Sequence, residues 1–440
     1  MDLLIEKLDG SRYYLSQYKV LITDFEESAP SVTRNSKQLD QRNGNIDFGG
    51  WHTDKTINIT GYYRADDIDE EEMLREKLYA LLSDPNGYYI TQLKTTPRVA
   101  VERPGETSGG YYDKLTDYPS HKRFLVYTEA PEVELVGNVG GTLLYKLTAE
   151  FKTLKLPYGE APARDVALND NKASAVGTNL LTNTGDLSAN WSWITSISTT
   201  TEYNGHPSMA FTSSTQQLPL QQLGLGKLQN STQYTASFWA KADNAGDKAH
   251  TELWGSIGAT DFVLTTNWVR YTAVLTSYSD ANANSSHSKC FFGVPAGNTG
   301  NVYIAEPKLE LGTTATTWCP NPADPEYNSW YYKMDGTASI PYSGTVPCNQ
   351  LEQQFAIELT AMGASSSLSF KIDDTEFTYS DGVASGDVFL LTGFSYTKNG
   401  LSIVSKTNKA YFILQPDKPN RITCNVPGTI KILGFQNLYA

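Results

Sequence analysis

Apolar and polar residues alternate in short runs along most of the chain, and this period of two predicts β-strands rather than helices. The run 55–63, KTINITGYY, places Ile57, Ile59 and Gly61 on one face of such a strand. Further strands in the N-terminal part are predicted at 12–23, 88–93, 98–101, 123–128 and 143–154.

One segment departs from this pattern and predicts an α-helix at 66–84, DDIDEEEMLREKLYALLSD. Acidic residues crowd its first turns, where the positive end of the helix dipole favours them. Pro85 and Gly87 follow directly and predict its end. Four leucines at helical spacing form one apolar stripe that should face a core: Leu74, Leu78, Leu81 and Leu82.

Two segments show no regular period. The stretch 103–122, RPGETSGGYYDKLTDYPSHK, is too long and turn-rich for a simple hairpin loop. We interpret it as a protruding arm that contacts a neighbouring subunit; the alternative is a surface loop without fixed structure. The stretch 156–171, LPYGEAPARDVALNDN, is predicted to be a linker because Pro, Gly, Ala and Asp dominate it.

The chain beyond this linker predicts two further β-domains. A module opens with NLLTNTGDLSANWSW at 179–193 and closes with YIAEPKLELGTTATTWCPNPAD at 303–324. These stretches bracket roughly 145 residues, the size of one domain. From residue 336 on, short runs recur at the cadence of a β-sandwich. The strands predicted there are 354–359, 368–372, 388–391, 401–404, 410–414, 421–424 and 429–433.

Length and charge limit the classes of protein to which this chain can belong. A chain of 440 residues should hold about three domains. Its net charge of −13 argues against binding to nucleic acid or to an anionic membrane, because both need a positive field. The opening MDLLIEKLDG is no secretory signal, and no apolar run approaches the ~18 residues of a membrane span. We therefore expect the four cysteines to be free and mostly buried: Cys290, Cys319, Cys348 and Cys424.

Outward-facing tryptophans are the main candidates for binding. In the strand 234–241, YTASFWAK, alternation places Trp239 and Lys241 on the polar face. In the next predicted strand, 250–256, HTELWGS, alternation places Glu252 and Trp254 on the same face. An exposed aromatic ring beside a few polar groups suits the apolar faces and the hydroxyls of a sugar. The alternative is that one or both tryptophans are buried against a loop.

Other aromatic residues of the module carry weaker signals. Tyr203 and Trp193 are secondary candidates for the sugar site. Trp191 is better explained by packing where the module begins. Trp268 and Trp318 are interpreted as anchors of the core.

The whole of 172–324 resembles the carbohydrate-binding modules of families 4 and 9. The matching stretches are NLLTNTGDLSANWSW, YTASFWAK, WVRYTAVLT and KLELGTTATTWCPNPAD. The resemblance implies a two-sheet jelly roll that binds glycans on a concave face. Many members carry an aspartate near a structural calcium where this chain has Ala305 and Glu306, so we predict no metal.

The flanks resemble the distal tail protein of bacteriophages with long, non-contractile tails. The closing strand YKLTAEFKTLKLP fits its ring-forming domain, and the stretches GTASIPYSG and ILGFQNLYA fit its galectin-like domain. The resemblance implies a mainly β chain with three parts. These are a ring-forming β-sandwich with one α-helix at 1–158, an inserted jelly-roll module at 172–324 and a galectin-like β-sandwich at 325–440.

The same resemblance implies a function and partners. The chain would form a homohexameric ring at the tail tip of the virion, after assembly in the cytoplasm of the bacterial host. It would contact the tail tube protein and the proteins of the tail tip or baseplate. Its module would bind polysaccharide of the host cell wall. Six weak sites on one ring would gain avidity of ~10²–10⁴.

We predict neither catalysis nor a cofactor. The five histidines are scattered without metal-ligand spacing, and no nucleophile or phosphate-binding motif is present. A glycosidase would need two carboxylates that converge on a cleft, and Glu252, Glu306 and Glu310 lie in a module whose family binds without cleaving. Two alternatives stay open: a secreted carbohydrate-binding accessory protein or adhesin, and a receptor-binding tail protein of different symmetry.

Overall fold

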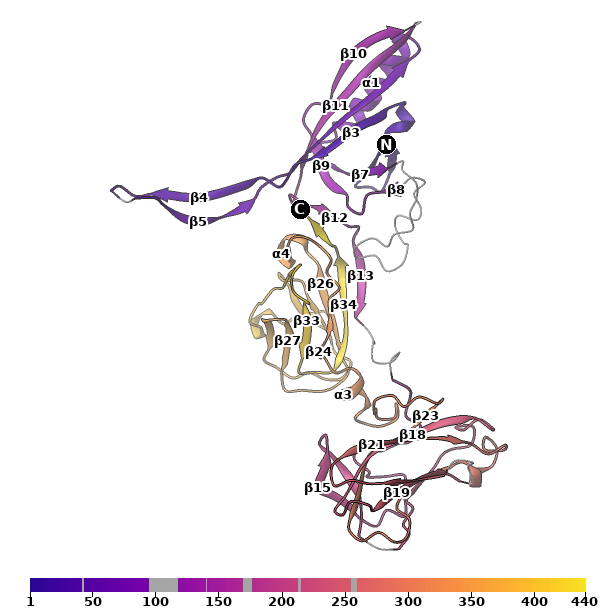
Figure 1. Cartoon of the computed structure of the whole chain (residues 1–440). Helices are drawn as coiled ribbons and strands as arrows, with labels where there is room; N and C mark the ends of the chain where they lie inside the picture. Colours follow the sequence, from indigo (N-terminus) through magenta and orange to yellow (C-terminus); the bar gives the residue numbers. More distant parts are fainter. Residues whose placement is uncertain (42, 95–117, 140, 169–175, 213–214, 255–258) are drawn as a thin grey trace.

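The computed structural model describes residues 1–440 except 42, 95–117, 140, 169–175, 213–214 and 255–258. The chain is mainly β, as predicted, and its three β-rich parts follow one another along an elongated molecule (Figure 1). Most of the arm predicted at 103–122 lies outside the described residues. Among the described helices, none has the length and apolarity needed to cross a bilayer.

The N-terminal domain is built on a nine-stranded antiparallel sheet in the order β2-β1-β7-β9-β11-β6-β3, with β8 beside β7 and β10 beside β11. Inward residues such as Ile57, Leu147 and Phe151 form its core with the buried face of the helix α1. Its strands are β1 (Asp2–Lys7), β2 (Arg12–Tyr14), β3 (Leu21–Glu27), β6 (Thr56–Ala65), β7 (Tyr88–Lys94), β8 (Tyr118–Pro119), β9 (Phe124–Thr128), β10 (Glu132–Val139) and β11 (Thr142–Thr153), with the 3-10 helix η1 (Leu15–Tyr18) after β2.

The predicted helix is confirmed as α1 (Ile68–Leu82). Asp67 caps it by accepting a hydrogen bond from the backbone amide of Glu70, which satisfies one of the free donors of the first turn. All four leucines of the predicted stripe are buried. Arg75 Nε donates to Glu71, four positions earlier on the same helix, at 2.8 Å.

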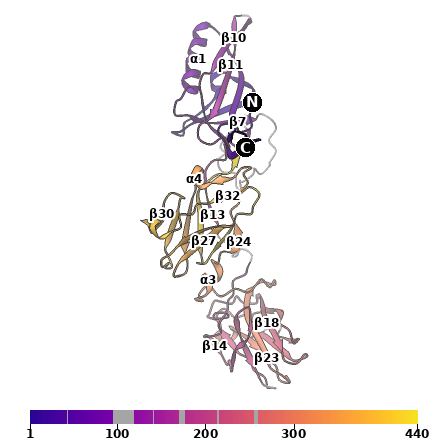
Figure 2. The same ribbon diagram turned by 90° about the vertical axis from the view of Figure 1, so that its left-hand side faces the viewer.

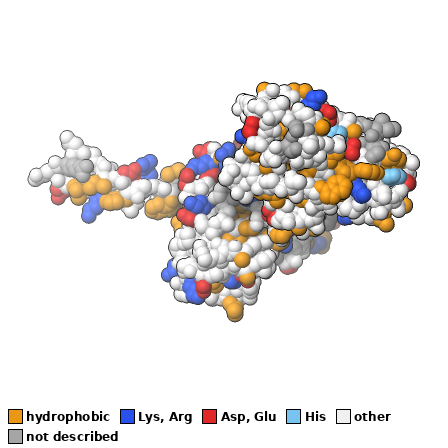
Figure 3. Space-filling view, turned by 90° about the horizontal axis from the view of Figure 1, so that it is seen from below, with side chains coloured by type: hydrophobic (Ala, Val, Ile, Leu, Met, Phe, Trp, Pro, Cys, Tyr) orange, Lys and Arg blue, Asp and Glu red, His pale blue; other side chains and the backbone are white. Residues whose placement is uncertain are grey.

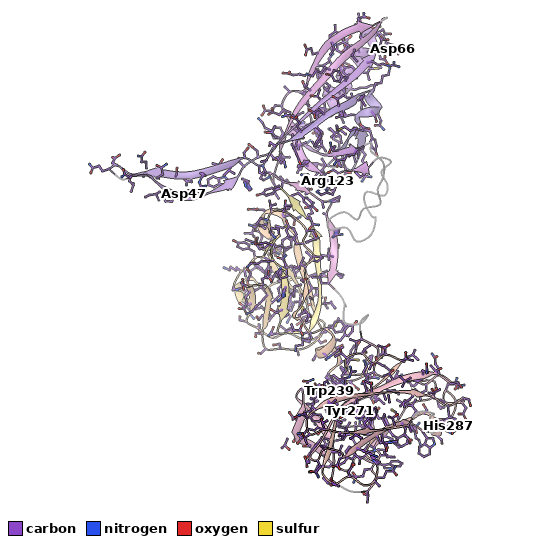
Figure 4. All side chains as sticks on the ribbon, viewed as in Figure 1. Asp47, Asp66, Arg123, Trp239, Tyr271 and His287 are labelled. Carbon is purple, nitrogen blue, oxygen red and sulfur yellow. The ribbon has the colours of Figure 1, made fainter. Side chains whose placement is uncertain are left out.

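A hairpin that the sequence did not reveal projects from this domain. Strands β4 (Val32–Gln38) and β5 (Asn45–His52) pair with each other alone and continue the hairpin of β3 and β6 outward. Figures 1 and 4 show this arm, which carries Asp47, standing clear of the rest of the chain. We call residues 32–52 the hairpin arm.

The prediction of a linker at 156–171 is wrong for most of that stretch. Strands β12 (Gly159–Glu160) and β13 (Arg164–Leu168) pair with β35 (Leu438–Tyr439) and β34 (Gly428–Phe435) near the end of the chain. These residues therefore belong to the sheets of the C-terminal domain. Their partners lie about 270 positions away, and local composition carries no signal for such pairing.

A buried charged cluster joins the N-terminal domain to these strands. The Arg123 guanidinium contacts Glu6 at 3.0 Å and Glu160 at 3.6 Å, and it lies 3.8 Å from the ring centre of Tyr89. Figure 4 shows Arg123 at the junction of the two domains. Burial raises the pKa of Glu160 more strongly than the nearby Arg123 charge lowers it.

This junction predicts a measurable dependence of stability on pH. Because the folded-state pKa of Glu160 is raised, the unfolded chain binds fewer protons than the folded one just above the ordinary carboxyl range. The free energy of unfolding should therefore fall as pH rises from about 4.5 through the raised pKa. Chemical unfolding across this range should show that the free energy of unfolding of Glu160→Gln rises relative to that of the wild type as the pH increases. A difference that stays constant with pH would contradict this prediction.

The C-terminal domain is a two-sheet sandwich around one apolar core. Its sheets have the orders β13-β34-β26-β29-β30-β31 and β24-β33-β27-β28. Several strands fall where the sequence predicted them. Its elements are β24 (Asp335–Ser339), β25 (Cys348–Asn349), α4 (Gln350–Gln353), β26 (Ala356–Ala361), β27 (Leu368–Ile372), β28 (Thr375–Tyr379), β29 (Val388–Leu391), β30 (Tyr396–Lys398), β31 (Leu401–Ser402), η4 (Val404–Lys406), β32 (Ile413–Leu414) and β33 (Arg421–Cys424).

The inserted module is a sandwich of two five-stranded antiparallel sheets, and a short helix, α3 (Tyr327–Tyr331), follows it. Figure 2 shows it as a separate body beyond the C-terminal domain. The first sheet has the order β14-β17-β22-β19-β20 and the second β15-β16-β23-β18-β21. Its elements are β14 (Trp191–Ser192), β15 (Ile197–Tyr203), β16 (His206–Phe211), β17 (Leu220–Gln222), β18 (Gln233–Ala242), β19 (Lys248–Leu253), β20 (Thr260–Val263), β21 (Val269–Thr276), η3 (Ser285–His287), β22 (Lys289–Gly293) and β23 (Val302–Leu311).

The stretches that open and close the module are tied to each other. The buried Asn179 donates to the carbonyls of Pro307 at 3.3 Å and Cys319 at 3.1 Å. Trp318 is buried, as predicted, and donates to Thr184 at 3.2 Å. The opening stretch 179–193 and the closing stretch 303–324 therefore meet where the sandwich closes.

The cysteines are free, as predicted. Three are buried, and Cys424 is half-buried. Burial raises the pKa of Cys424 to about 11, so its thiol stays protonated at neutral pH.

Candidate functional site

The two sheets of the module separate the predicted sugar-binding residues onto opposite outer faces. In β18, Phe238 and Ala240 point into the core, so Trp239 and Lys241 face outward from the second sheet. In β19, Ala249 and Leu253 point into the core, and Glu252 therefore faces outward from the first sheet. Trp254 follows β19 directly. Trp239 and Trp254 thus cannot share one binding surface.

The outer face of the first sheet has an apolar floor. Phe291 pairs with Leu220 on one side and with Glu252 on the other, so their side chains point to the same face. Phe291 and Leu220 are 1% and 4% exposed, although Cys290 and Phe292, the strand neighbours of Phe291, point into the core on the other side.

Trp254 lies at the margin of this floor and is open to solvent. Its ring stacks on Phe291 with 5.4 Å between centroids and 30° between planes, yet 43% of the residue is exposed. The Lys289 ammonium lies 5.5 Å from the ring centre. Phe291 therefore fixes the orientation of the indole without sealing it. The space-filling view from below shows hydrophobic side chains gathered on the module surface (Figure 3).

Polar groups surround the apolar floor. His250 lies 3.5 Å from Glu252 and 2.7 Å from Asp261, which places a histidine between two carboxylates. These groups can donate and accept hydrogen bonds beside an open ring, as sugar hydroxyls require. The sequence analysis missed Phe291, His250 and Asp261. The alternation of KCFFG in β22 could have indicated that Phe291 faces outward.

Trp193 follows β14 at the far edge of the same sheet. It is 66% exposed, and its backbone has a φ of +69°, a conformation that costs a non-glycine residue energy. Backbone strain beside an exposed aromatic ring is typical of a functional position. The first sheet thus carries Trp193, Glu252 and Trp254 of the predicted residues.

The outer face of the second sheet holds a closed aromatic cluster. Tyr203 stacks on Trp239 with 4.2 Å between centroids and 24° between planes. Trp268, predicted as a core anchor, packs against Tyr203 on this outer face instead, at 5.4 Å. The Lys241 ammonium lies 5.8 Å from the Trp268 ring and 5.6 Å from the Tyr303 ring. Because Tyr203 and Trp239 stack on each other, each ring covers one face of the other, and that face cannot stack on a sugar.

Replacing Trp239 by alanine should therefore act on stability. Removal of this half-buried ring leaves Tyr203 without its stacking partner, and we expect a loss of about 2–4 kcal/mol in the unfolding free energy. Thermal and denaturant unfolding of the full chain would measure it. Trp254→Ala should cost less stability than Trp239→Ala, because 43% of Trp254 is exposed whereas Trp239 is half-buried. An unchanged melting transition in Trp239→Ala would contradict the structural role of this cluster.

The carboxylate predicted to replace a calcium-binding aspartate is engaged by neighbouring side chains. Glu306 is buried and lies 2.9 Å from His206 Nδ1, and it accepts a hydrogen bond from Asn204 at 3.3 Å. Within the described residues, no group of three or more His, Cys, Asp or Glu side chains is placed to hold a metal ion.

One protein-family model matches the N-terminal part of the chain. Residues 8–140 match the model of the phage tail protein RIFT-related domain. This match confirms the resemblance of the N-terminal flank to a phage tail protein. No curated protein sequence matches the chain.

The similar solved structures include proteins of phage tails and carbohydrate-binding modules. The hub protein Dit of phage SPP1 is similar over 100% of this chain and 99% of its own, with 9% identity and a TM-score of 0.42. The baseplate of phage p2 covers 71% of this chain and 98% of its own, with 10% identity and a TM-score of 0.26. A family 16 carbohydrate-binding module covers 30% of this chain and 99% of its own, with 17% identity and a TM-score of 0.23. All three scores are below 0.5, so function is inferred below from the family match and the side chains.

Proposed function

We propose that this chain, whose residues 8–140 are a phage tail protein domain, is a structural hub of the distal tail that also binds host saccharide. The observation that supports the structural role is the family match. The observation that supports saccharide binding is the open, oriented indole of Trp254 above an apolar floor edged by polar groups. Neither role requires catalysis or a cofactor.

The proposed sugar site is the outer face of the first sheet of the module. Trp254 would supply the stacking surface, and Glu252 with His250 would hydrogen-bond to hydroxyl groups. Trp193 would extend the site along the sheet. The partner is a polysaccharide of the host cell wall, because a tail tip must hold a repetitive surface polymer.

The proposed assembly is a homohexameric ring between the tail tube protein and the proteins of the tail tip or baseplate. The hairpin arm supports an assembled state, since a lone two-stranded hairpin is at best marginally stable in water. Six modules on one ring would multiply a weak single-site affinity by ~10²–10⁴. Such a ring would belong to the virion and form in the host cytoplasm.

The ring has a direct test. Multi-angle light scattering and negative-stain images of the purified full chain should show six-fold rings. A stable trimer would favour the receptor-binding protein of different symmetry instead. A monomer at high concentration would favour the accessory protein or adhesin. Either result would overturn the hub.

The adsorption role has a separate test. The full chain fused to a fluorescent protein should label cells of a susceptible host and bind wall polysaccharide extracted from them. If the chain forms rings but labels no susceptible strain, the result would contradict saccharide binding and leave the structural role in place.

A further inference from the structure

Trp51 and Ile46 lie on one face of the hairpin arm, and Val32 and the charged residues Arg34 and Asp47 lie on the other. The register of the arm pairs Thr33 with Trp51 and Lys37 with Ile46, which places both pairs on the same side. Arg34 and Asp47 form an ion pair on the opposite side. Along the arm, Trp51 is 55% exposed, Phe48 60% and Leu39 41%. Large apolar side chains on a projecting element indicate a surface that another protein covers.

A second exposed apolar surface lies on the C-terminal domain. Phe394 is 66% exposed, Tyr411 40% and Ile413 37%. The hydroxyl of Tyr396 lies 2.8 Å from the carbonyl oxygen of Ala410 and 3.0 Å from that of Gly393, so its one hydrogen is shared between the loops that carry Tyr411 and Phe394. We call Phe394, Tyr411 and Ile413 the C-terminal patch.

The two surfaces lie at the same level of the molecule. His52, the last residue of the arm, contacts the hydroxyl of Tyr158 at 2.7 Å, and Tyr158 packs on the C-terminal core. Burial and then the Glu352 carboxylate raise the pKa of Tyr158, so helix α4 lies close to the root of the arm. The side chain of Leu351 in α4 lies beside Gly393, next to the patch. The arm itself points away from this domain (Figure 1), so it does not cover the patch of its own chain.

We propose that the hairpin arm of one copy packs, with the face that carries Trp51 and Ile46, on the C-terminal patch of the next copy in the ring. A head-to-tail contact between two different surfaces closes into a ring when the rotation between copies allows it. The charges of the two surfaces are also complementary. Lys37 lies on the same face of the arm as Ile46 and Trp51, and the exposed Glu352 lies next to Leu351 beside the C-terminal patch of the next copy. This inference rests on the proposed ring and names the surfaces that form it.

Cross-linking between copies tests the proposal. In the full chain carrying Phe48→Cys and Phe394→Cys on a Cys424→Ser background, a short bifunctional maleimide should produce a ladder of bands up to a closed covalent ring. The matched control Asn45→Cys with Phe394→Cys places the thiol on the face of the arm that carries Arg34 and Asp47 and should give almost no ladder. All the changed side chains are exposed or half-buried, so folding should be retained.

The outcomes separate this proposal from the ring itself. Rings by light scattering with equal cross-linking in both pairs, or with none, would overturn the contact and leave the hub intact. A product confined to one chain would show that the arm folds back on its own domain, which also overturns it. Absence of any ring in the unmodified chain would instead overturn the proposed hub.

Discussion

Replacing Trp254 by alanine is expected to abolish most of the binding to host wall polysaccharide while the fold persists. The exposed indole offers an aromatic surface on the first sheet, and Phe291 holds it in place. Loss of such an anchor should cost about 2 kcal/mol per site, roughly a thirtyfold rise in Kd. Calorimetric titration with wall polysaccharide extracted from a susceptible strain would measure it.

Cell labelling should be more sensitive than titration, because a ring multiplies the loss at each site through avidity. Leu225→Ala is the matched control, since Leu225 is an exposed apolar residue of the same module, 61% accessible, and has no proposed role. Wild-type affinity in Trp254→Ala, with circular dichroism unchanged, would remove the sugar site from this face.

Replacing Lys308 by alanine should destabilise the inserted module more than any surface change. Lys308 and Glu310 are 0% and 1% exposed and lie 3.2 Å apart. Lys308 also donates to the carbonyl of Thr317 at 2.8 Å, and the amide of Thr316 donates to Glu310 at 2.7 Å. Removing the ammonium leaves Glu310 charged and buried, and we expect a loss of about 3–5 kcal/mol in unfolding free energy.

Two further variants of this pair make the prediction specific. Lys308→Met combined with Glu310→Leu removes both charges and should lose much less stability than Lys308→Ala. Lys227→Ala, at an exposed lysine, should stay within about 0.5 kcal/mol of the wild type. Urea unfolding of the full chains, followed by the tryptophan fluorescence of the module, would rank them. Equal losses in Lys308→Ala and Lys227→Ala would show that the Lys308–Glu310 pair does not stabilise the closing stretch 303–324 of the module.

Local pattern was enough to predict much of the secondary structure. The stripe of four leucines, the acidic first turn and the Pro–Gly stop predicted α1 because each acts within one or two turns of helix. Several strands, such as β27, β29 and β33, begin and end where alternation predicted them. The outward direction of Trp239 and Glu252 was also correct, since alternation decides which side of a strand a residue occupies.

The sequence by itself therefore determined many of the elements, the acidic charge and the likeness of the N-terminal part to a phage tail protein. Only the tertiary structure decided that Trp239 and Trp254 lie on different sheets, that Tyr203 covers Trp239, and that 159–168 belongs to the last domain. It alone revealed the hairpin arm. The physical reason is that alternation decides to which side of its strand a side chain points. The sheet that the strand joins, and the residues that cover the outer face of that sheet, depend on partners far away along the chain.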